Sequence, residues 1–258
     1  MREDDPKRGT DRRVASHGER SGVIAGVEKA IRYPTESDDV VRTVAIGGLL
    51  MLFGFLVVPL FVVGGYAIRV LDRTASGDDA PPTFDAWGEM TVTGLKAVVI
   101  GFVYMLLPTV VGGGVFLVGV LGVGVSGDGA IAGLGLLGAM LGGLLWFALS
   151  LLVAYLVPAA LANFAETPTL GAGFDLGTLK PVWLSRTYAL GWATAFLVLL
   201  IGGLVTAVLN VVPVLGTIAG AFVGFYFAIA AYSVIGHTWA DVSTVPRRDH
   251  ETLNDPAV

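Results

Sequence analysis

The sequence contains no cysteine and few charged residues. Without thiols the chain cannot form disulfides, hold a metal through thiolates or use a cysteine nucleophile. Charged residues make up 14% of the chain and hydrophobic residues 54%, whereas about a quarter of a soluble domain is charged. In water such a chain would expose more apolar surface than soluble proteins tolerate. We therefore expect it to lie in a lipid bilayer.

Motifs of catalysis, metal binding and nucleotide binding are also missing. None of the three histidines, His17, His237 and His250, has the spacing from an acid or another histidine that a metal site or triad requires. The run Gly133-Leu-Gly-Leu-Leu-Gly138 has the letters of a dinucleotide fingerprint, but it lies inside an apolar stretch with no strand before it. We expect no catalytic residue, metal, cofactor or nucleic-acid partner, and therefore no enzyme.

Long uncharged stretches dominate the rest of the chain. They cover residues 43–68, 97–125, 130–165 and 187–240. Each exceeds the roughly 20 residues that a helix needs to cross a bilayer. A turn at Asn210 divides the last stretch into two. The expected membrane domain over residues 37–241 therefore has segments at 40–71, 95–125, 130–165, 187–209 and 214–238.

The basic residues indicate how these segments are oriented. The loop over residues 71–94 with its flanking Arg69 and Lys96, and the loop over residues 166–186, carry lysine or arginine; the loop over residues 126–129 and the turn at Asn210 carry none. Because cytoplasmic loops are enriched in Lys and Arg, the first and third loops and both termini are expected on the cytoplasmic side. Five crossings cannot satisfy that expectation.

The conflict disappears if the first segment turns back. We predict that residues 43–68 form a re-entrant or tight hairpin bent near Pro59, which protein must cover because its backbone is not helical there. A glycine pair precedes Pro59 in the same way as another precedes Pro213. The predicted fold is an all-α, polytopic integral membrane helical bundle. It has a re-entrant first segment, four full spans and interfacial amphipathic helices, multi-pass in the cell membrane.

Polar segments flank this domain. Residues 1–21 alternate in charge and are predicted to be a disordered tail, and residues 242–258 form a polar C-terminal tail. Between them and the membrane, residues 22–33 place Val27 and Ala30 on one helical face and charges on the other. This pattern predicts an amphipathic interfacial helix, or else a segment that is only sometimes helical.

Two loops contain the same short element. Phe84-Asp85 is followed by Lys96 and Phe174-Asp175 by Arg186, each base eleven residues after its Asp. Since eleven residues make about three helical turns, each pair could share one face of a helix that slides along the interface before entering the bilayer. The alternative is coincidence. The residues proposed as interface or partner contacts are Phe84, Asp85, Trp87, Lys96, Phe174, Asp175 and Arg186.

Glycine and tryptophan positions carry structural predictions. Small residues four apart let membrane helices approach closely, and this spacing occurs at Gly138, Gly142, Gly216, Gly220 and Gly224. Indole rings settle at the headgroup level, so the tryptophans near span ends are interpreted as anchors: Trp87, Trp183, Trp192 and Trp239.

Few polar groups lie inside the spans. No charge falls near the middle of any span, where a coupled transporter usually holds its ion. The uncharged candidates are Tyr104, Tyr155, Asn163, Thr206 and Asn210, which can simply bond a neighbouring helix. Pro108 and Pro158 could break their helices as in transport sites, although proline is also common in ordinary membrane helices.

Three motifs resemble a known family. They are Gly-Tyr-x-x-Arg-Val-Leu at Gly65 to Leu71, Pro-Pro-x-Phe-Asp-x-Trp-Gly at Pro81 to Gly88, and Thr-Gly-Leu-Lys-Ala at Thr93 to Ala97. With their surroundings they resemble domain of unknown function 4013, an uncharacterised family of polytopic membrane proteins, chiefly archaeal, over about residues 30–240. The resemblance implies an integral membrane protein and names no functional residue.

The function expected from these observations is that of a non-enzymatic membrane component. It would organise partners or lipids through its cytoplasmic loops, with the bilayer and a membrane or cytoplasmic protein as partners. The alternative is a small-solute or lipid transporter that uses the spans with glycine and proline. A water-filled cavity lined by Tyr104, Tyr155 or Asn163 would favour transport, and tight packing of the helices would favour the organising role. The sequence leaves the oligomeric state open.

Overall fold

The computed structural model describes residues 22–36, 39–125 and 129–243. Over these residues all regular structure is helical, as the sequence predicts. The predicted tail over residues 1–21 and most of the C-terminal tail lie outside the described residues. A helix over residues 22–32 comes first. It is followed by η1 (Tyr33–Glu36), α2 (Val40–Leu52), η2 (Gly54–Leu56), α3 (Val58–Ala75), α4 (Trp87–Val125), α5 (Gly129–Glu166), η3 (Leu170–Phe174), α6 (Leu176–Trp183), α7 (Arg186–Leu209) and α8 (Pro213–Val242).

Four helices are long and apolar enough to cross a membrane. They are α4, α5, α7 and α8, with 24 to 38 residues each in the apolar part. This finding confirms the predicted all-α membrane fold and its four candidate spans. The spans pair in chain order, because α4 packs mainly on α5 and α7 packs mainly on α8.

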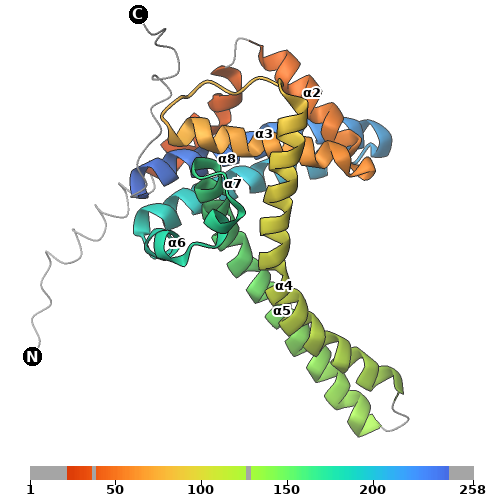
Figure 1. Cartoon of the computed structure of the whole chain (residues 1–258). Coiled ribbons are helices and arrows are strands. Elements are labelled where there is room, and N and C mark those ends of the chain that lie inside the picture. The colour runs from red at the N-terminus through yellow and green to blue at the C-terminus, as the bar shows by residue number, and fades with distance from the viewer. Residues whose placement is uncertain (1–21, 37–38, 126–128, 244–258) are drawn as a thin grey trace, which may run out of the picture.

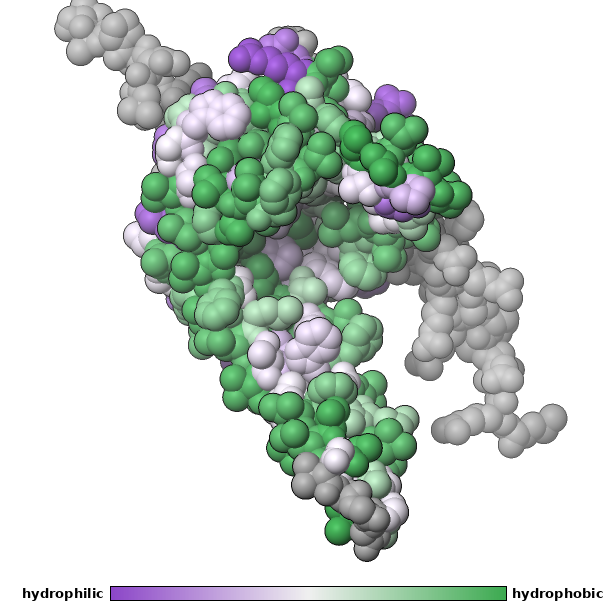
Figure 2. All heavy atoms as spheres, turned by 90° about the vertical axis from the view of Figure 1, so that its right-hand side faces the viewer, coloured by the Kyte–Doolittle hydropathy of each residue, from purple (hydrophilic) through white to green (hydrophobic). Residues whose placement is uncertain are grey.

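The two hairpins have different surroundings. The α4–α5 hairpin projects from the other helices as an arm (Figure 1). In contrast, α8 lies among α2, α3, α5 and α7 and contacts all of them. Apolar residues predominate on the surface of the arm, while the most hydrophilic residues lie at the opposite end of the molecule (Figure 2). An apolar arm of this kind needs lipid around it.

Glycines set the close approach of α4 and α5. A Cβ atom on Gly142 would lie 2.2 Å from the backbone nitrogen of Phe116, and one on Gly119 would lie 2.1 Å from that of Ala139. At Gly138, a second predicted packing position, the nearest atom would be 3.4 Å away, an ordinary contact. Gly119 and Gly142 are therefore positions where the hairpin tolerates no side chain.

The predicted glycine stripe on α8 faces two different helices. A Cβ on Gly216 would lie 2.1 Å from the Leu209 carbonyl oxygen, and one on Gly220 would lie 2.9 Å from the Thr206 methyl group, both on α7. Gly224 has more room and faces α2, where the nearest atom is the sulfur of a methionine at 3.8 Å. Only the first two glycines serve the α7–α8 hairpin.

The first apolar segment is broken in two. Helix α2 ends at Leu52 and α3 begins at Val58, with η2 between them. Val57 adopts a positive φ of 67° just before Pro59, a conformation that strains a β-branched residue. Both helices pack on α8. The break falls where the hairpin was predicted, and the path of residues 43–68 relative to the membrane stays a prediction.

The helix over residues 22–32 packs against the spans. Ala30 is buried in the main core, and the hydroxyl of Tyr226 on α8 donates to the carbonyl oxygen of Ile31. Gly26 lies against Thr194 of α7, whereas Ile24 is 67% exposed. The buried face therefore passes through Gly26 and Ala30, and it rests on protein.

Candidate functional site

Two connectors carry the residues that were predicted to make partner contacts. The first, residues 76–86, joins α3 to α4, and the second, residues 167–185, joins α5 to α7 through η3 and α6. Because α4 begins after the first connector and α5 ends before the second, both lie at the same end of the antiparallel arm (Figure 1). We call this end of the molecule the polar face.

The first connector is fastened by an aromatic stack. The rings of Tyr66 and Phe84 lie 4.3 Å apart between centroids, and the Tyr66 hydroxyl donates to the Pro82 carbonyl oxygen at 2.9 Å. Phe84 is only 9% exposed and also contacts Phe225 of α8. Aromatic neighbours on two helices therefore enclose Phe84, and its contact with lipid or a partner stays a prediction.

Asp85 pairs with a base that the sequence analysis did not assign to it. The Arg69 guanidinium donates to the Asp85 carboxylate and, at 3.2 Å, to its carbonyl oxygen, while the Thr83 hydroxyl donates to the other carboxylate oxygen at 3.0 Å. These bonds, first that from Arg69 and then that from Thr83, hold the pKa of Asp85 below its usual value. Asp85 does not share a helix with Lys96, as the spacing suggested, because it lies before α4 begins and is separated from it by Ala86 at a φ of 47°.

The backbones of α3 and α4 touch beside this pair. A Cβ on Gly65 would lie 1.9 Å from the Met90 carbonyl oxygen, and one on Gly94 would lie 1.7 Å from that of Phe61. The three motifs of the family resemblance thus form one structural unit. Glycines bring α3 and α4 together, and Tyr66 and Arg69 of α3 then hold the first connector in place.

The second connector repeats part of this arrangement. Phe174 stacks on Tyr104 of α4 at 5.5 Å, and the Tyr104 hydroxyl donates to the Gly173 carbonyl oxygen at 2.9 Å. Asp175 caps α6, since its carboxylate accepts from the Thr178 hydroxyl at 2.8 Å and the Gly177 amide at 3.0 Å. These two bonds hold the pKa of Asp175 below its usual value. Asp175 is exposed on this face, so it remains available to a partner.

The two connectors differ in how they enter the bilayer. The first continues directly into the 39-residue α4, which Trp87 begins with its side chain 45% exposed. The second forms the short α6, and a new helix then starts at Arg186 with Ser185 as its N-cap. Lys96 lies within α4 and Arg186 at the first residue of α7. The two bases therefore occupy different positions relative to their helix starts.

Proline opens one turn of α5. Proline has no amide hydrogen, so Pro158 leaves the carbonyl oxygen of Ala154 without its helical donor. The indole nitrogen of Trp192 on α7 donates to this oxygen at 2.9 Å. Trp192 was interpreted as a headgroup anchor; in the structure its polar atom completes a neighbouring helix.

Two more aromatic residues close the same turn. The Tyr188 hydroxyl donates to the Tyr155 carbonyl oxygen at 2.7 Å and accepts from the Ala159 amide at 3.2 Å, so it bridges a helical bond. The indole of Trp183 donates to the Leu156 carbonyl oxygen at 3.2 Å. The groups that a broken helix would offer to a transported solute are occupied by protein.

Three of the other polar groups predicted at depth also bind backbone. The Asn163 amide donates to the Ala172 carbonyl oxygen at 2.8 Å, and the Tyr155 hydroxyl donates to that of Trp183 at 2.6 Å. Asn210 bonds the end of its own helix at the α7–α8 turn. Asn163 and Tyr155, like Tyr104, therefore fasten the second connector to the spans.

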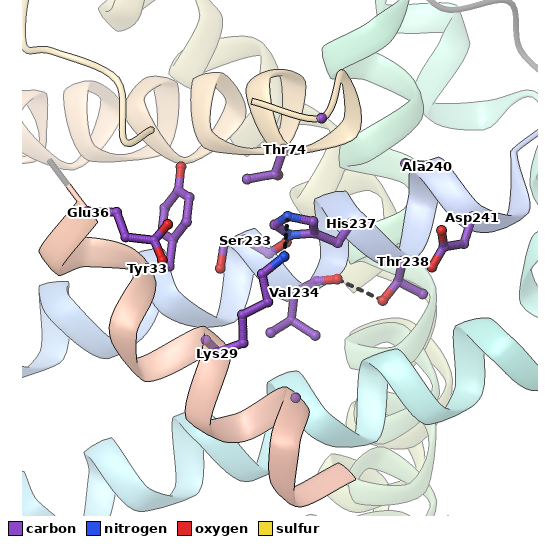
Figure 3. Close-up of a pocket in the computed structure, with 13 residues that line it drawn as sticks. Lys29, Tyr33, Glu36, Thr74, Ser233, Val234, His237, Thr238, Ala240 and Asp241 are labelled. Atoms are coloured by element: carbon purple, nitrogen blue, oxygen red, sulfur yellow. Dashed lines mark hydrogen bonds between the residues drawn. The ribbon is translucent and has the colours of Figure 1, made fainter. Parts of the chain in front are cut away.

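A cavity of 440 Å³ opens on the polar face, between the helix over residues 22–32, the end of α3 and the end of α8. We call it the polar cavity (Figure 3). At its edge His237 Nε2 lies 2.5 Å from Asp79 Oδ1, and Lys29 Nζ lies 3.5 Å from the same oxygen. The sequence analysis did not single out Lys29 or Asp79, because the two are brought together only by the fold.

His237 contacts the backbone of its own helix and the carboxylate of Asp79. Nδ1 lies 2.7 Å from the Ser233 carbonyl oxygen, which can only accept, so Nδ1 carries hydrogen. Partial burial raises the pKa of Asp79, but the hydrogen bond from His237 and the charges of His237 and Lys29 outweigh it and hold the pKa below its usual value. Asp79 is therefore a carboxylate, and the same oxygen lies close to both His237 Nε2 and Lys29 Nζ.

Within the described part of the chain, no group of three or more His, Asp or Glu side chains is arranged to hold a metal ion. The polar face combines two fastened connectors with one charged cavity. Fold and site together define a polytopic, all-α integral membrane protein.

A family model described as "Protein of unknown function (DUF4013)" matches residues 49–211, and the chain belongs to this family. The matched range includes both connectors and is shorter at each end than the resemblance in the sequence suggested. Lys29 and His237 lie outside it. No curated protein and no solved structure matches the chain.

Proposed function

We propose that this protein is a non-enzymatic membrane component that organises partners or lipids through its polar face, which we place on the cytoplasmic side. The observation that carries the proposal is the closed turn at Pro158. There Trp192, Tyr188 and Trp183 occupy the polar backbone atoms that a solute pathway would need. The polar side chains within the spans support the same proposal, because they hold the second connector in place.

The charge distribution supports the same proposal. Ion pairs of the spans and connectors gather at the polar face, at Arg69 with Asp85 and at Lys29 with Asp79 and His237. The arm instead presents apolar side chains along its length (Figure 2). A protein built in this way is anchored by its spans and offers its chemistry at the membrane surface.

The alternative is transport of a small solute or lipid. One observation favours it: the Ser150 hydroxyl in α5 is buried and has no hydrogen-bond partner among the described residues. A water-filled pathway past α5 would supply that partner.

Cysteine accessibility separates the two proposals, because the chain is free of cysteine. We would introduce Ser150→Cys in α5 and, as a control, Gly171→Cys on the second connector, where an added Cβ meets nothing within 4 Å. The membranes are prepared so that the reagent reaches both of their faces. A membrane-impermeant thiol reagent should then label Gly171→Cys and leave Ser150→Cys unmodified. Rapid labelling of Ser150→Cys would overturn the organising role in favour of a solute pathway.

A partner assembly is the second readout. A thiol-directed crosslinker in native membranes should join Gly171→Cys to one discrete partner. The same reagent should give no such product from Val211→Cys at the α7–α8 turn, which we place on the opposite side. Equal products from both positions would show collision in the membrane and would contradict an organising face.

A further inference from the structure

The polar cavity is arranged like an anion-binding site in which a side chain of the protein, the Asp79 carboxylate, takes the place of the anion. Lys29 Nζ and His237 Nε2 lie only 3.5 Å apart and both approach the same oxygen of Asp79. Two nitrogens this close together, one of them a lysine ammonium, suit an anion that lies between them. Asp79 provides that anion from the connector, and its side chain is half exposed. A ligand could therefore replace it without unfolding a helix.

A third group in the cavity has no partner. Tyr33 is 2% exposed, and its hydroxyl makes no hydrogen bond among the described residues. Figure 3 shows this hydroxyl pointing toward α3. Burial raises the pKa of Tyr33, so the phenol is neutral and can donate. An unpaired buried hydroxyl is costly and calls for a ligand or water.

The other lining residues limit the charge of the ligand. Glu36 and Asp241 also line the cavity. With Lys29, His237 and Asp79 counted, the cavity cannot favour a highly charged anion. A singly charged group that accepts several hydrogen bonds fits best, and a phosphodiester has this chemistry.

We propose that the polar cavity binds a monoanionic phosphodiester, which displaces the Asp79 carboxylate from Lys29 and His237 and accepts a bond from Tyr33. The inference rests on the proposed function in that it names the chemistry the polar face recognises. Lipid headgroups carry this group, and so do soluble glycerophosphodiesters. The cavity lies where α3 and α8 reach the polar face, so both sources can approach it.

Variants with opposite expected effects test the displacement. The full chain in an uncharged maltoside detergent is titrated with short-chain phosphatidylglycerol, and the dissociation constant is measured by calorimetry. Asp79→Asn removes the competing charge and should bind about three- to tenfold more tightly, whereas Lys29→Gln should bind about tenfold more weakly. A structural role of Asp79 alone would not tighten binding.

Matched controls exclude general attraction between charges. Asp78→Asn makes the same charge change at the next residue, which pairs with Arg73. Arg32→Gln is the control for Lys29→Gln: it removes one positive charge from the same helix, at a residue that pairs with Glu28. Both should bind as the unmodified chain does. If Asp79→Asn binds no more tightly than Asp78→Asn, or if Lys29→Gln equals Arg32→Gln, the site is wrong.

Tyr33→Phe gives a readout that does not depend on the charges. Without ligand it should melt at a higher temperature than the unmodified chain, because an unpaired hydroxyl is removed. With ligand it should bind more weakly, since a donor is lost. Unchanged affinity in Tyr33→Phe would contradict the role assigned to this residue.

A last experiment identifies the source of the phosphodiester. If soluble glycerophosphoglycerol binds, and the variants rank in the same order of affinity, the site is sustained and is assigned to a soluble ligand. If only the lipid binds, the site is assigned to lipid headgroups. Absence of both bindings overturns the cavity. The proposed function would still stand in that case if Ser150→Cys remains unlabelled, so the two failures are distinguishable.

Discussion

The guanidinium of Arg69 binds both the carboxylate and the backbone carbonyl oxygen of Asp85, sixteen residues further along the chain. One side chain thus fixes the point at which the first connector becomes α4. Arg69 is 25% exposed, so solvent screens this interaction only in part. The Phe-Asp element is therefore held from α3 and not from the helix that it precedes.

Loss of Arg69 should weaken the first connector. Arg69→Gln is expected to lower the free energy of unfolding in detergent by about 1–2 kcal/mol, the scale of hydrogen bonds to charged groups. Arg73→Gln is the matched control, because Arg73 pairs with Asp78 only at 3.5 Å at the surface; it should cost less than about 0.5 kcal/mol. Equal effects of the two variants would contradict the special role of Arg69.

The acid dependence of the polar cavity follows from Asp79. Its pKa lies below the ordinary 3.8, so its pairing stabilises the fold fully above that value and is lost as the pH falls through the lowered pKa. The difference in melting temperature between the unmodified chain and Asp79→Asn should stay constant between about pH 4 and 6. It should shrink below that range. A difference that already shrinks at pH 5 would contradict the pairing.

Close packing in the arm predicts a sharp contrast between adjacent glycines. Gly142→Ala should lower the free energy of unfolding by about 1–3 kcal/mol, because its Cβ would overlap the backbone of Phe116. Gly143→Ala should be nearly neutral, since its Cβ would make an ordinary 3.7 Å contact with the Phe116 ring. Thermal melting of both variants in detergent measures the contrast. Similar melting temperatures would show that α4 and α5 are less tightly packed than described.

Single cysteines test the predicted topology. Thr35→Cys, Ser76→Cys and Thr169→Cys should be labelled from the cytoplasmic side, and Gly129→Cys and Val211→Cys from the other side. This outcome requires an even number of crossings and a first segment that turns back. If Thr35→Cys and Ser76→Cys are labelled from opposite sides, residues 43–68 cross the membrane fully.

Hydropathy and charge predicted most of the fold because they act locally. A long apolar run must form a helix in lipid, where each backbone group needs a partner, so α4, α5, α7 and α8 could be located from the sequence. The partners of particular side chains could not. Spacing suggested that Asp85 and Lys96 share one face of a helix. Asp85 instead lies before α4 and binds Arg69, which reaches it from α3 because glycines bring α3 and α4 together.

The charged cavity was unpredictable for the same reason. Lys29, Asp79 and His237 are separated by 50 and 158 residues, and no periodic pattern links them. Only the packing of the helix over residues 22–32 on α7 and α8 brings them together. Tyr104 and Asn163 were identified from their polarity at depth, whereas their bonds to the second connector depended on where that connector folds.

The closed turn at Pro158 yields the most specific prediction. Trp192→Phe removes the donor to the Ala154 carbonyl oxygen and should lower the free energy of unfolding by about 1–2 kcal/mol, because this acceptor already lacks its helical donor and is left unpaired in a membrane-spanning helix. Pro158→Ala restores a helical amide that can serve the same oxygen. In that background Trp192→Phe should cost clearly less, so the two changes should be non-additive in a double-mutant cycle. Additive effects would mean that Trp192 stabilises α5 by ring packing alone, and the closed turn would no longer support the organising role.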